Sequence, residues 1–135
     1  MILFLLVVAL GSYLYFFVYH KSHADIYKTK PDVTIDALSL YSDFHDNETL
    51  ANESYLGKVI RVSGQILEIQ REEDRVSAIR LDVGELLDAV VCEMDQVYQR
   101  ETGKLKVGDS VTLQGVCTGF LEDVILNRCA VIESH

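Results

Sequence analysis

An almost unbroken run of apolar residues opens the chain, from Ile2 to Tyr19, and no charged side chain interrupts it. A helix that crosses a membrane needs about 20 consecutive apolar residues, and a run of about 18 or more is typical of such a helix. The alternative is a cleaved signal peptide, which has a basic start, a shorter apolar core and a small-residue cleavage site. No lysine or arginine precedes the run. We therefore predict a retained transmembrane anchor over residues 1–20.

The chain changes character after the apolar run. Residues 21–33 are polar and lack periodicity, which predicts a linker, and residues 34–135 are enough for one soluble domain. The net charge of −9 is unevenly divided, since three lysines and one aspartate give residues 1–31 a charge of +2 and leave −11 on the rest. Because such a negative field repels phosphate backbones, we expect nucleic acid to be an unfavourable partner.

Two short helices are predicted at the start of the soluble domain. Residues 37–44 carry apolar side chains at helical spacing, and Thr34 is the expected N-cap. Residues 48–55 form the second predicted helix, with Asn47 as its N-cap and Gly57 as the residue that stops it. The domain should therefore begin with a helical preface.

The remaining chain alternates apolar and polar residues with the period of two that is typical of strands. The pattern predicts five strands, over residues 58–70, 76–83, 87–94, 110–120 and 124–132. In the first strand the alternation changes phase near Gly64, which favours a bulge or a sharp bend. Five strands with a bent first strand describe an OB-fold, a partly open Greek-key barrel. The predicted fold class is mainly β, a five-stranded OB-fold barrel with short preceding α-helices and an N-terminal transmembrane helix.

Three stretches of the sequence resemble a known family. They read ANxxYxGKVIxVxG from Ala51 to Gly64, LKVGDxVTLxG from Leu105 to Gly115, and CTGFLxDVxLxxC from Cys117 to Cys129. On these residues the chain resembles the tRNA-anti-like family of OB-fold domains, over about residues 33–133. The resemblance implies an OB-fold without enzymatic activity and, since an N-terminal anchor is common in the family, attachment to a membrane. It does not imply binding of tRNA.

A set of candidate ligand-binding residues follows from the fold. OB barrels bind ligands across their second and third strands and the loops that join strands one to two and four to five. By alternation, Arg61 and Gln65 face outward on the first strand and Arg80 on the second, while Phe120 lies at the corner of the fourth and fifth. We predict these four as ligand-binding residues. The alternative is that they are ordinary surface residues.

Cys117 and Cys129 are equidistant from Asp123, the expected centre of the last hairpin, and should therefore face each other across it. Opposed cross-strand Cβ atoms lie about 4.5–5.5 Å apart, close to the distance that a disulfide spans. The two residues are a disulfide candidate, and the alternative is a pair of reduced core thiols. The sequence has no Cys-x-x-Cys pair and no histidine near the cysteines, so we predict no metal site and no cofactor.

The sequence gives opposed indications of the side of the membrane on which the domain lies. Lys21, Lys28 and Lys30 follow the apolar run, which favours a cytoplasmic domain. The disulfide candidate favours an oxidising compartment. The resemblance to anchored envelope proteins of the family implies an exported domain, so we predict a single-pass membrane protein with an extracytoplasmic domain.

No catalytic constellation is visible in the sequence. There is no G-x-S-x-G motif and no grouping of nucleophile, base and orienting residue, so we predict that the protein is not an enzyme. The predicted function is a membrane-anchored OB-fold module that binds a protein or a small ligand, whose identity the sequence leaves open. The alternative, by analogy of fold alone, is an OB-fold protein that binds single-stranded nucleic acid or tRNA.

Overall fold

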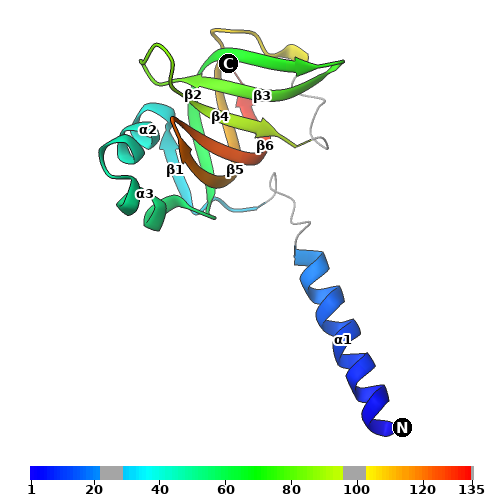
Figure 1. Cartoon of the computed structure of the whole chain (residues 1–135). Helices are drawn as coiled ribbons and strands as arrows, with labels where there is room; N and C mark the ends of the chain where they lie inside the picture. Colours follow the sequence, from blue (N-terminus) through cyan, green and yellow to red (C-terminus); the bar gives the residue numbers. More distant parts are fainter. Residues whose placement is uncertain (22–28, 96–102, 135) are drawn as a thin grey trace.

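The computed structural model describes residues 1–21, 29–95 and 103–134, with the side chains of residues 17–21 left out. Figure 1 labels its helices and strands along the chain. They are α1 (Ile2–Lys21), β1 (Val33–Asp36), α2 (Ala37–Asp46), α3 (Glu48–Tyr55), β2 (Val59–Glu72), β3 (Arg75–Asp82), β4 (Ala89–Met94), β5 (Ser110–Leu121) and β6 (Asp123–Ser134).

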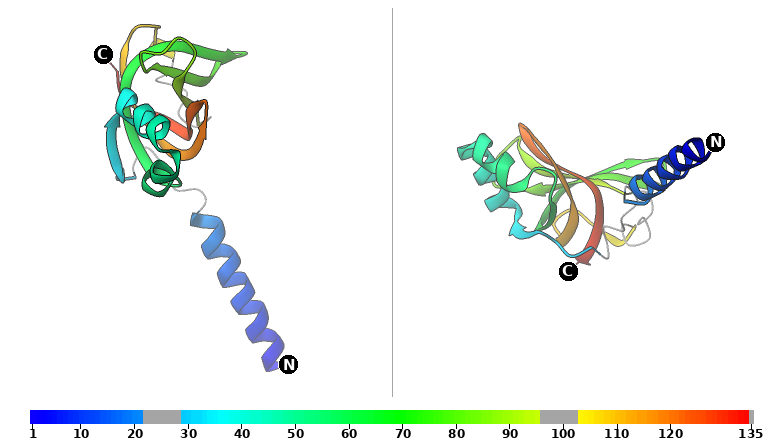
Figure 2. Two further views of the ribbon diagram at one scale, coloured as in Figure 1. Left: turned by 60° about the vertical axis from the view of Figure 1, so that its left-hand side comes forward. Right: turned by 90° about the horizontal axis from the view of Figure 1, so that it is seen from below.

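The first helix, α1, forms where the opening apolar run predicts a helix. The side chains of residues 2–16 are all exposed, and α1 stands clear of the barrel in Figures 1 and 2. Within the described residues, no helix is both long enough and apolar enough to cross a membrane. The predicted transmembrane helix over residues 1–20 is therefore not supported. The predicted linker over residues 21–33 falls mainly on residues 22–28, which lie outside the described part of the chain.

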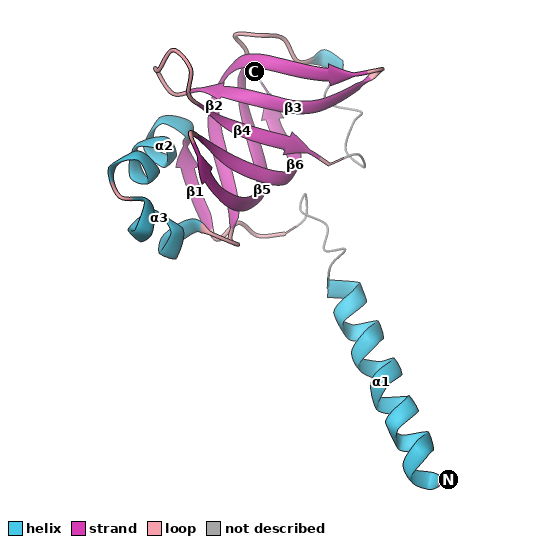
Figure 3. Ribbon diagram, viewed as in Figure 1, coloured by secondary structure: helices cyan, strands magenta, loops and turns pink. Residues whose placement is uncertain are grey.

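A closed barrel forms the centre of the fold. The strand order is β1-β2-β3-β4-β6-β5, and a further pairing between β2 and β5 closes the ring. Figure 3 colours strands magenta and helices cyan, and it shows a mainly β molecule with α2 and α3 beside the barrel. The five predicted strands correspond to β2 through β6, so the prediction of a five-stranded OB-fold barrel is confirmed.

The short strand β1 replaces the expected first turn of the first predicted helix. It pairs in parallel with β2, from Val33 opposite Ile60 to Asp36 opposite Ser63. The run of β-branched residues that makes up most of β1 favours a strand over a helix. The prediction of Thr34 as N-cap is therefore wrong, because Thr34 lies inside this strand.

The N-cap of α2 is Asp36. Its carboxylate accepts hydrogen bonds from the backbone N–H of Ser39 at 3.0 Å and from the hydroxyl of Ser39 at 2.7 Å. The hydrogen bond from the Ser39 hydroxyl is the main cause of the lowered pKa of Asp36. An aspartate at this position satisfies N–H groups that the first helical turn leaves unpaired.

The second predicted helix is confirmed as α3. The side-chain oxygen of Asn47 accepts from the backbone N–H of Leu50 at 3.1 Å, as an N-cap does. Past the end of the helix, Gly57 adopts a φ of 77°, and its N–H donates to the carbonyl of Cys117 at 2.8 Å. Gly57 thus ends α3 and connects it to β5.

An aromatic cluster, made of Tyr41, Phe44, Tyr55 and Phe120, joins the two helices to the barrel. Phe44 is fully buried, and its ring centroid lies 5.7 Å from those of both Tyr55 and Phe120. The ring centroids of Tyr41 and Phe120 are 6.2 Å apart. These separations lie in the range of favourable aromatic pairs. The cluster therefore fixes α2 and α3 against β5.

The longest strand, β2, changes partner along its length. Residues 59–65 pair with β5, whereas residues 66–72 run along β3. The first of two register shifts between β2 and β3 lies between Ile66 and Glu68, slightly beyond the predicted bend at Gly64. A Cβ atom added at Gly64 would lie 3.2 Å from the Cβ of Ala37, so the glycine allows α2 to approach the strand closely.

We expect Gly64→Val to lower the free energy of unfolding by about 1–3 kcal/mol, because the branched side chain would overfill the contact with Ala37. The neighbouring Ser63→Val is the control. Ser63 is exposed, so its substitution should change stability by no more than about 0.5 kcal/mol. Urea unfolding of both variants measures the difference. Equal stabilities would show that α2 is not seated against Gly64.

Candidate functional site

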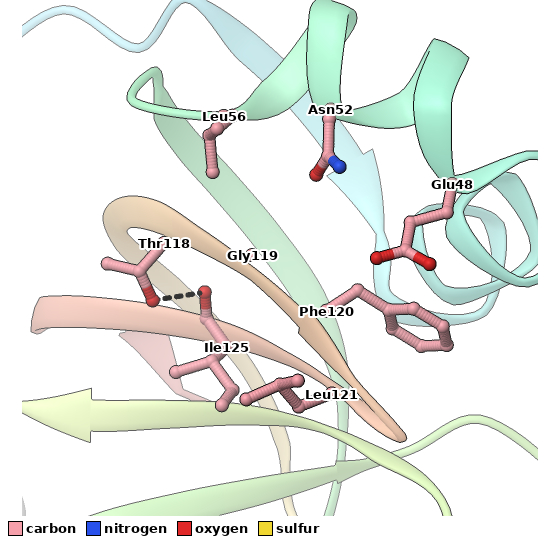
Figure 4. A pocket seen from close by; sticks show the side chains of 8 residues that line it. All are labelled: Glu48, Asn52, Leu56, Thr118, Gly119, Phe120, Leu121 and Ile125. Atoms are coloured by element: carbon pink, nitrogen blue, oxygen red, sulfur yellow. Dashed lines mark hydrogen bonds between the residues drawn. The ribbon is translucent and has the colours of Figure 1, made fainter.

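A pocket of about 350 Å³ lies between α3 and the hairpin of β5 and β6 (Figure 4). We call it the α3–β5 pocket. Its volume is within the range of sites that hold small ligands, about 300–1,000 Å³. The residues that line it are Glu48, Asn52, Leu56, Thr118, Gly119, Phe120, Leu121 and Ile125.

The helical wall of the pocket follows from the spacing of its residues. Glu48, Asn52 and the C-cap residue Leu56 follow one another at intervals of four residues, which places them on one face of α3. Figure 4 shows all three side chains pointing toward β5. They were not predicted as site residues, although their spacing in the sequence predicts that they share one side of the helix.

The opposite wall is formed by the end of the β5–β6 hairpin. Gly119 has a φ of 139° and no side chain, and a Cβ atom added there would lie 4.0 Å from the Cδ1 of Leu56. Because Gly119 has no side chain, the hairpin leaves space beside Leu56. The hydroxyl of Thr118 donates to the carbonyl of Ile125 at 3.2 Å, which holds the two strands together below the pocket.

The lining combines apolar surface with one negative charge. Leu56 and Leu121 are 50% and 80% exposed, so both offer apolar surface to a ligand. Glu48 is the one charged residue among the described residues that line the pocket. Glu122 at the tip of the hairpin is exposed as well. Such a lining suits a cationic or neutral ligand with an apolar part, and it disfavours a polyanion.

Of the four predicted ligand-binding residues, only Phe120 lines this pocket. Arg61 on β2 donates from Nε to the side-chain oxygen of Gln114 at 3.0 Å. Gln114 is fully buried and donates to the carbonyl of Thr29 at 2.6 Å. Gln65 is exposed on β2 opposite Ser110. The roles of these residues in ligand binding stay predictions, and the structure does not gather the four around one cavity.

Arg80 joins the β3–β4 loop to the β5–β6 hairpin. Its Nη1 lies 3.0 Å from Oδ2 of Asp123, and its Nη2 donates to the carbonyl of Leu87 at 2.9 Å. The other carboxylate oxygen of Asp123 accepts from the backbone N–H of Ala89 at 2.8 Å. Arg80 also lies 3.5 Å from the more exposed Glu68. Its guanidinium is thus engaged in holding two loops together.

We expect Asp123→Ala to lower the free energy of unfolding by about 2–3 kcal/mol, because both Arg80 and the Ala89 N–H lose a charged acceptor. Glu68→Ala is the matched control, since it removes the other carboxylate beside Arg80. The Glu68 side chain is 56% exposed, and exposed ion pairs contribute about 0–1 kcal/mol. Denaturant unfolding of both variants tests this. Equal losses would show that the loop contact is not structural.

In the register of β5 and β6, Cys117 and Cys129 do not face each other as the disulfide prediction required. The hairpin turns at Glu122 and not at Asp123, since Leu121 lies opposite Asp123, and a register shift follows between Cys117 and Gly119. Cys117 therefore lies opposite Leu126. Cys129 pairs instead with Met94 on β4, and its thiol interacts with that of Cys92. All three cysteines are free and buried. Burial is the main cause of the raised pKa of both Cys117 and Cys129.

We expect that the protein, denatured without reductant, offers three thiols to an alkylating reagent, because Cys117 and Cys129 are not opposed. Intact mass spectrometry after alkylation counts them. The variants Cys117→Ser and Cys129→Ser should each lose one adduct. A single adduct located on Cys92 would show that Cys117 and Cys129 are cross-linked and that the hairpin has another register.

Comparison with known proteins gives both a family and a fold relative. The family model described as tRNA_anti-like matches residues 1–131. A search of curated proteins gives no match. A crystal structure from Klebsiella pneumoniae, of a lipoprotein proposed to bind nucleic acid, is similar with a TM-score of 0.53 at 18% identity, covering 73% of this chain and 91% of that one.

A second similar structure is the Stn1–Ten1 complex of S. pombe. Its TM-score is 0.40 at 15% identity, and the match covers 54% of this chain and 57% of that chain. The likeness to the lipoprotein from Klebsiella pneumoniae concerns the fold alone. The family model spans nearly the whole sequence, including the three stretches that carry the resemblance. The chain therefore belongs to the tRNA_anti-like family of OB-fold domains.

Proposed function

We propose that the protein is a non-catalytic binding module, which takes up a ligand with an apolar part and a positive charge in the α3–β5 pocket. The observation that carries the proposal is the lining of this pocket of about 350 Å³, which combines the exposed apolar side chains of Leu56 and Leu121 with the carboxylate of Glu48. The pocket lies where two separate elements, α3 and the β5–β6 hairpin, meet. OB barrels commonly use this hairpin loop in ligand binding.

The chemistry of the lining supports binding over catalysis. Among the described residues of the lining, Glu48 alone is ionisable, and the hydroxyl of Thr118 donates to the carbonyl of Ile125. Histidine and cysteine do not occur among the described lining residues. A general base beside an activated nucleophile is the minimum for covalent hydrolytic chemistry, and these groups do not provide one.

We further propose that α1 attaches the protein to a membrane, with the barrel on the extracytoplasmic side. The apolar side chains of α1 support attachment, since Ile2, Leu3 and Phe4 are 77%, 77% and 72% exposed. Exposed apolar surface of this extent requires cover, and lipid is one source of cover. Alkaline extraction of membranes followed by protease treatment of spheroplasts tests both parts. A protein released by alkali contradicts attachment, and a barrel protected from protease contradicts export.

The binding proposal is tested by NMR titration of the full chain in detergent micelles. The probe is phenethylamine, a small cation with an apolar ring. We expect it to shift the amide signals of Leu56, Gly119 and Leu121, and Glu48→Gln should weaken this response. The control Glu53→Gln changes the net charge equally at an exposed residue of α3 outside the pocket. The absence of shifts at the pocket would overturn the proposal.

The same preparation tests the nucleic-acid alternative. Oligodeoxythymidylate is added at low salt and then titrated with sodium chloride. We expect no submicromolar binding, because the chain from residue 32 onward carries a net charge of −11, from the total of −9 and the +2 of residues 1–31. Tight binding that weakens steeply with salt would favour nucleic-acid recognition instead.

A further inference from the structure

We infer that the occupant of the α3–β5 pocket is an extended, basic segment of a partner polypeptide, which adds as a strand to the outer edge of β5 over residues 118–121. The inference rests on the proposed function, since it requires that the pocket is a binding site. It adds the chemical class of the occupant and the backbone groups that hold it.

The outer edge of β5 loses its strand partner partway along. The ladder between β2 and β5 ends where Val59 pairs with Val116. Two further hydrogen bonds follow, from the N–H of Cys117 to the carbonyl of Lys58 at 3.0 Å and from the N–H of Gly57 to the carbonyl of Cys117 at 2.8 Å. Before Gly57 the chain turns into α3, so β2 cannot accompany β5 any further.

β5 nevertheless continues to Leu121. Over this last part it pairs with β6, as Gly119 lies opposite Ile125 and Phe120 opposite Val124. Within the described residues, no strand pairs with the other edge of residues 118–121. An unpaired strand edge is a template for an added strand, and this is a recurring mode of peptide recognition.

The α3–β5 pocket is the space along this open edge. Figure 4 shows β5 between β6 and α3, with the side chains of Asn52 and Leu56 reaching across from the helix. An added strand lies about 4.7–4.9 Å from its neighbour. It would therefore run between β5 and α3. Because Leu56 is half-exposed, its side chain is available to cover an apolar residue of the added segment.

The edge lacks the residues that commonly protect exposed strands. In natural proteins, lysine, proline or inward-pointing charged residues on an edge strand prevent another strand from pairing with it. Residues 118–121 read Thr-Gly-Phe-Leu, with Phe120 half-buried in the aromatic cluster and Leu121 80% exposed. An apolar, uncharged edge of this kind favours backbone pairing.

The negative charge around the α3–β5 pocket favours a basic occupant. Glu48 lines one end of the pocket, and Glu122 lies at the tip of the hairpin directly after the open edge. A lysine or arginine of the added segment would form a charge-assisted hydrogen bond with Glu48. The net negative charge of the barrel domain attracts the same segment from a distance.

Fluorescence polarisation with the full chain in detergent micelles tests this occupant. The first probe is a labelled hexapeptide of alternating lysine and valine. The second has the same sequence with alternate backbone amides methylated, which removes strand hydrogen bonds but keeps charge and side chains. The third replaces lysine by glutamate. We expect the first to bind, the second to bind at least about tenfold more weakly and the third not to bind.

Variants of the protein complete the test. Glu48→Gln should weaken binding of the lysine–valine peptide by about tenfold, whereas Glu53→Gln, with the same change in net charge, should leave it nearly unchanged. Equal binding of the methylated peptide would overturn strand addition, and equal effects of the two variants would overturn recognition by Glu48. If phenethylamine binds in the pocket but the peptide does not, the proposed function stands and this inference falls. If neither binds, both fall.

Discussion

Gly115→Ala is expected to be among the most destabilising single substitutions in this protein, with a loss of about 3 kcal/mol in the free energy of unfolding. Gly115 is a buried residue of β5 and lies opposite Ile60 of β2. A Cβ atom added there would overlap the Sγ of Cys129 and would lie 2.8 Å from the backbone carbonyl oxygen of Asn127. The second contact cannot be relieved by a side-chain rotation, so the strands themselves must separate.

Thermal unfolding measures the effect, and Gly103→Ala is the control. Gly103 has open space around the position of a Cβ atom, so its substitution should leave the melting temperature nearly unchanged. A loss of about 3 kcal/mol corresponds to a decrease of roughly 10–20 °C for a domain of this size. The double variant Gly115→Ala, Cys129→Ala should recover part of the loss, because it removes the closer contact. A Gly115→Ala protein that melts like the native one would contradict the packing described here.

Phe44→Ala is expected to cost about 3–5 kcal/mol, the range for removal of a large buried aromatic side chain. Phe44 is fully buried and contacts both Tyr55 on α3 and Phe120 on β5. Its loss would open a cavity where the two helices are attached to the barrel. Because Phe120 lines the α3–β5 pocket, the substitution should also weaken ligand binding there.

The control for Phe44→Ala is Leu38→Ala on the same helix. Leu38 is 54% exposed, so its removal should cost no more than about 1 kcal/mol. Chemical denaturation followed by far-UV circular dichroism compares the two variants. Equal and small losses would show that α2 is not anchored through the aromatic cluster.

The main elements of the fold could be predicted because they depend on local patterns. Alternation of apolar and polar residues identified the five barrel strands, since only that period buries one face of a strand. The helix α3 was predicted from Asn47 and Gly57, whose cap and left-handed conformations need residues of these types. β1 was not predicted, because Thr34 and Asp36 are both of residue types that suit an N-cap. These residues form a strand because they pair with the free edge of β2.

The candidate site was harder to predict because it is assembled from distant parts of the chain. Phe120 was found from its place at the end of a strand. Glu48, Asn52 and Leu56 share a helix face, but nothing local indicates that this face meets the hairpin of β5 and β6. Arg80 was predicted as an outward ligand-binding residue, and only the structure shows that its guanidinium lies beside Asp123.

The sequence by itself determined the class of the protein: an apolar N-terminal helix, a mainly β barrel and an acidic surface, since each follows from composition and short-range periodicity. Only the tertiary structure decided the register of the last hairpin. The hairpin turns at Glu122, one residue before the expected centre, and a register shift between Cys117 and Gly119 moves Cys117 further from Cys129. A register shift moves side chains by one position at little local cost, so long-range packing, such as the seating of Cys129 against Gly115, selects it. The same packing places α3 beside the open edge of β5 and so creates the pocket.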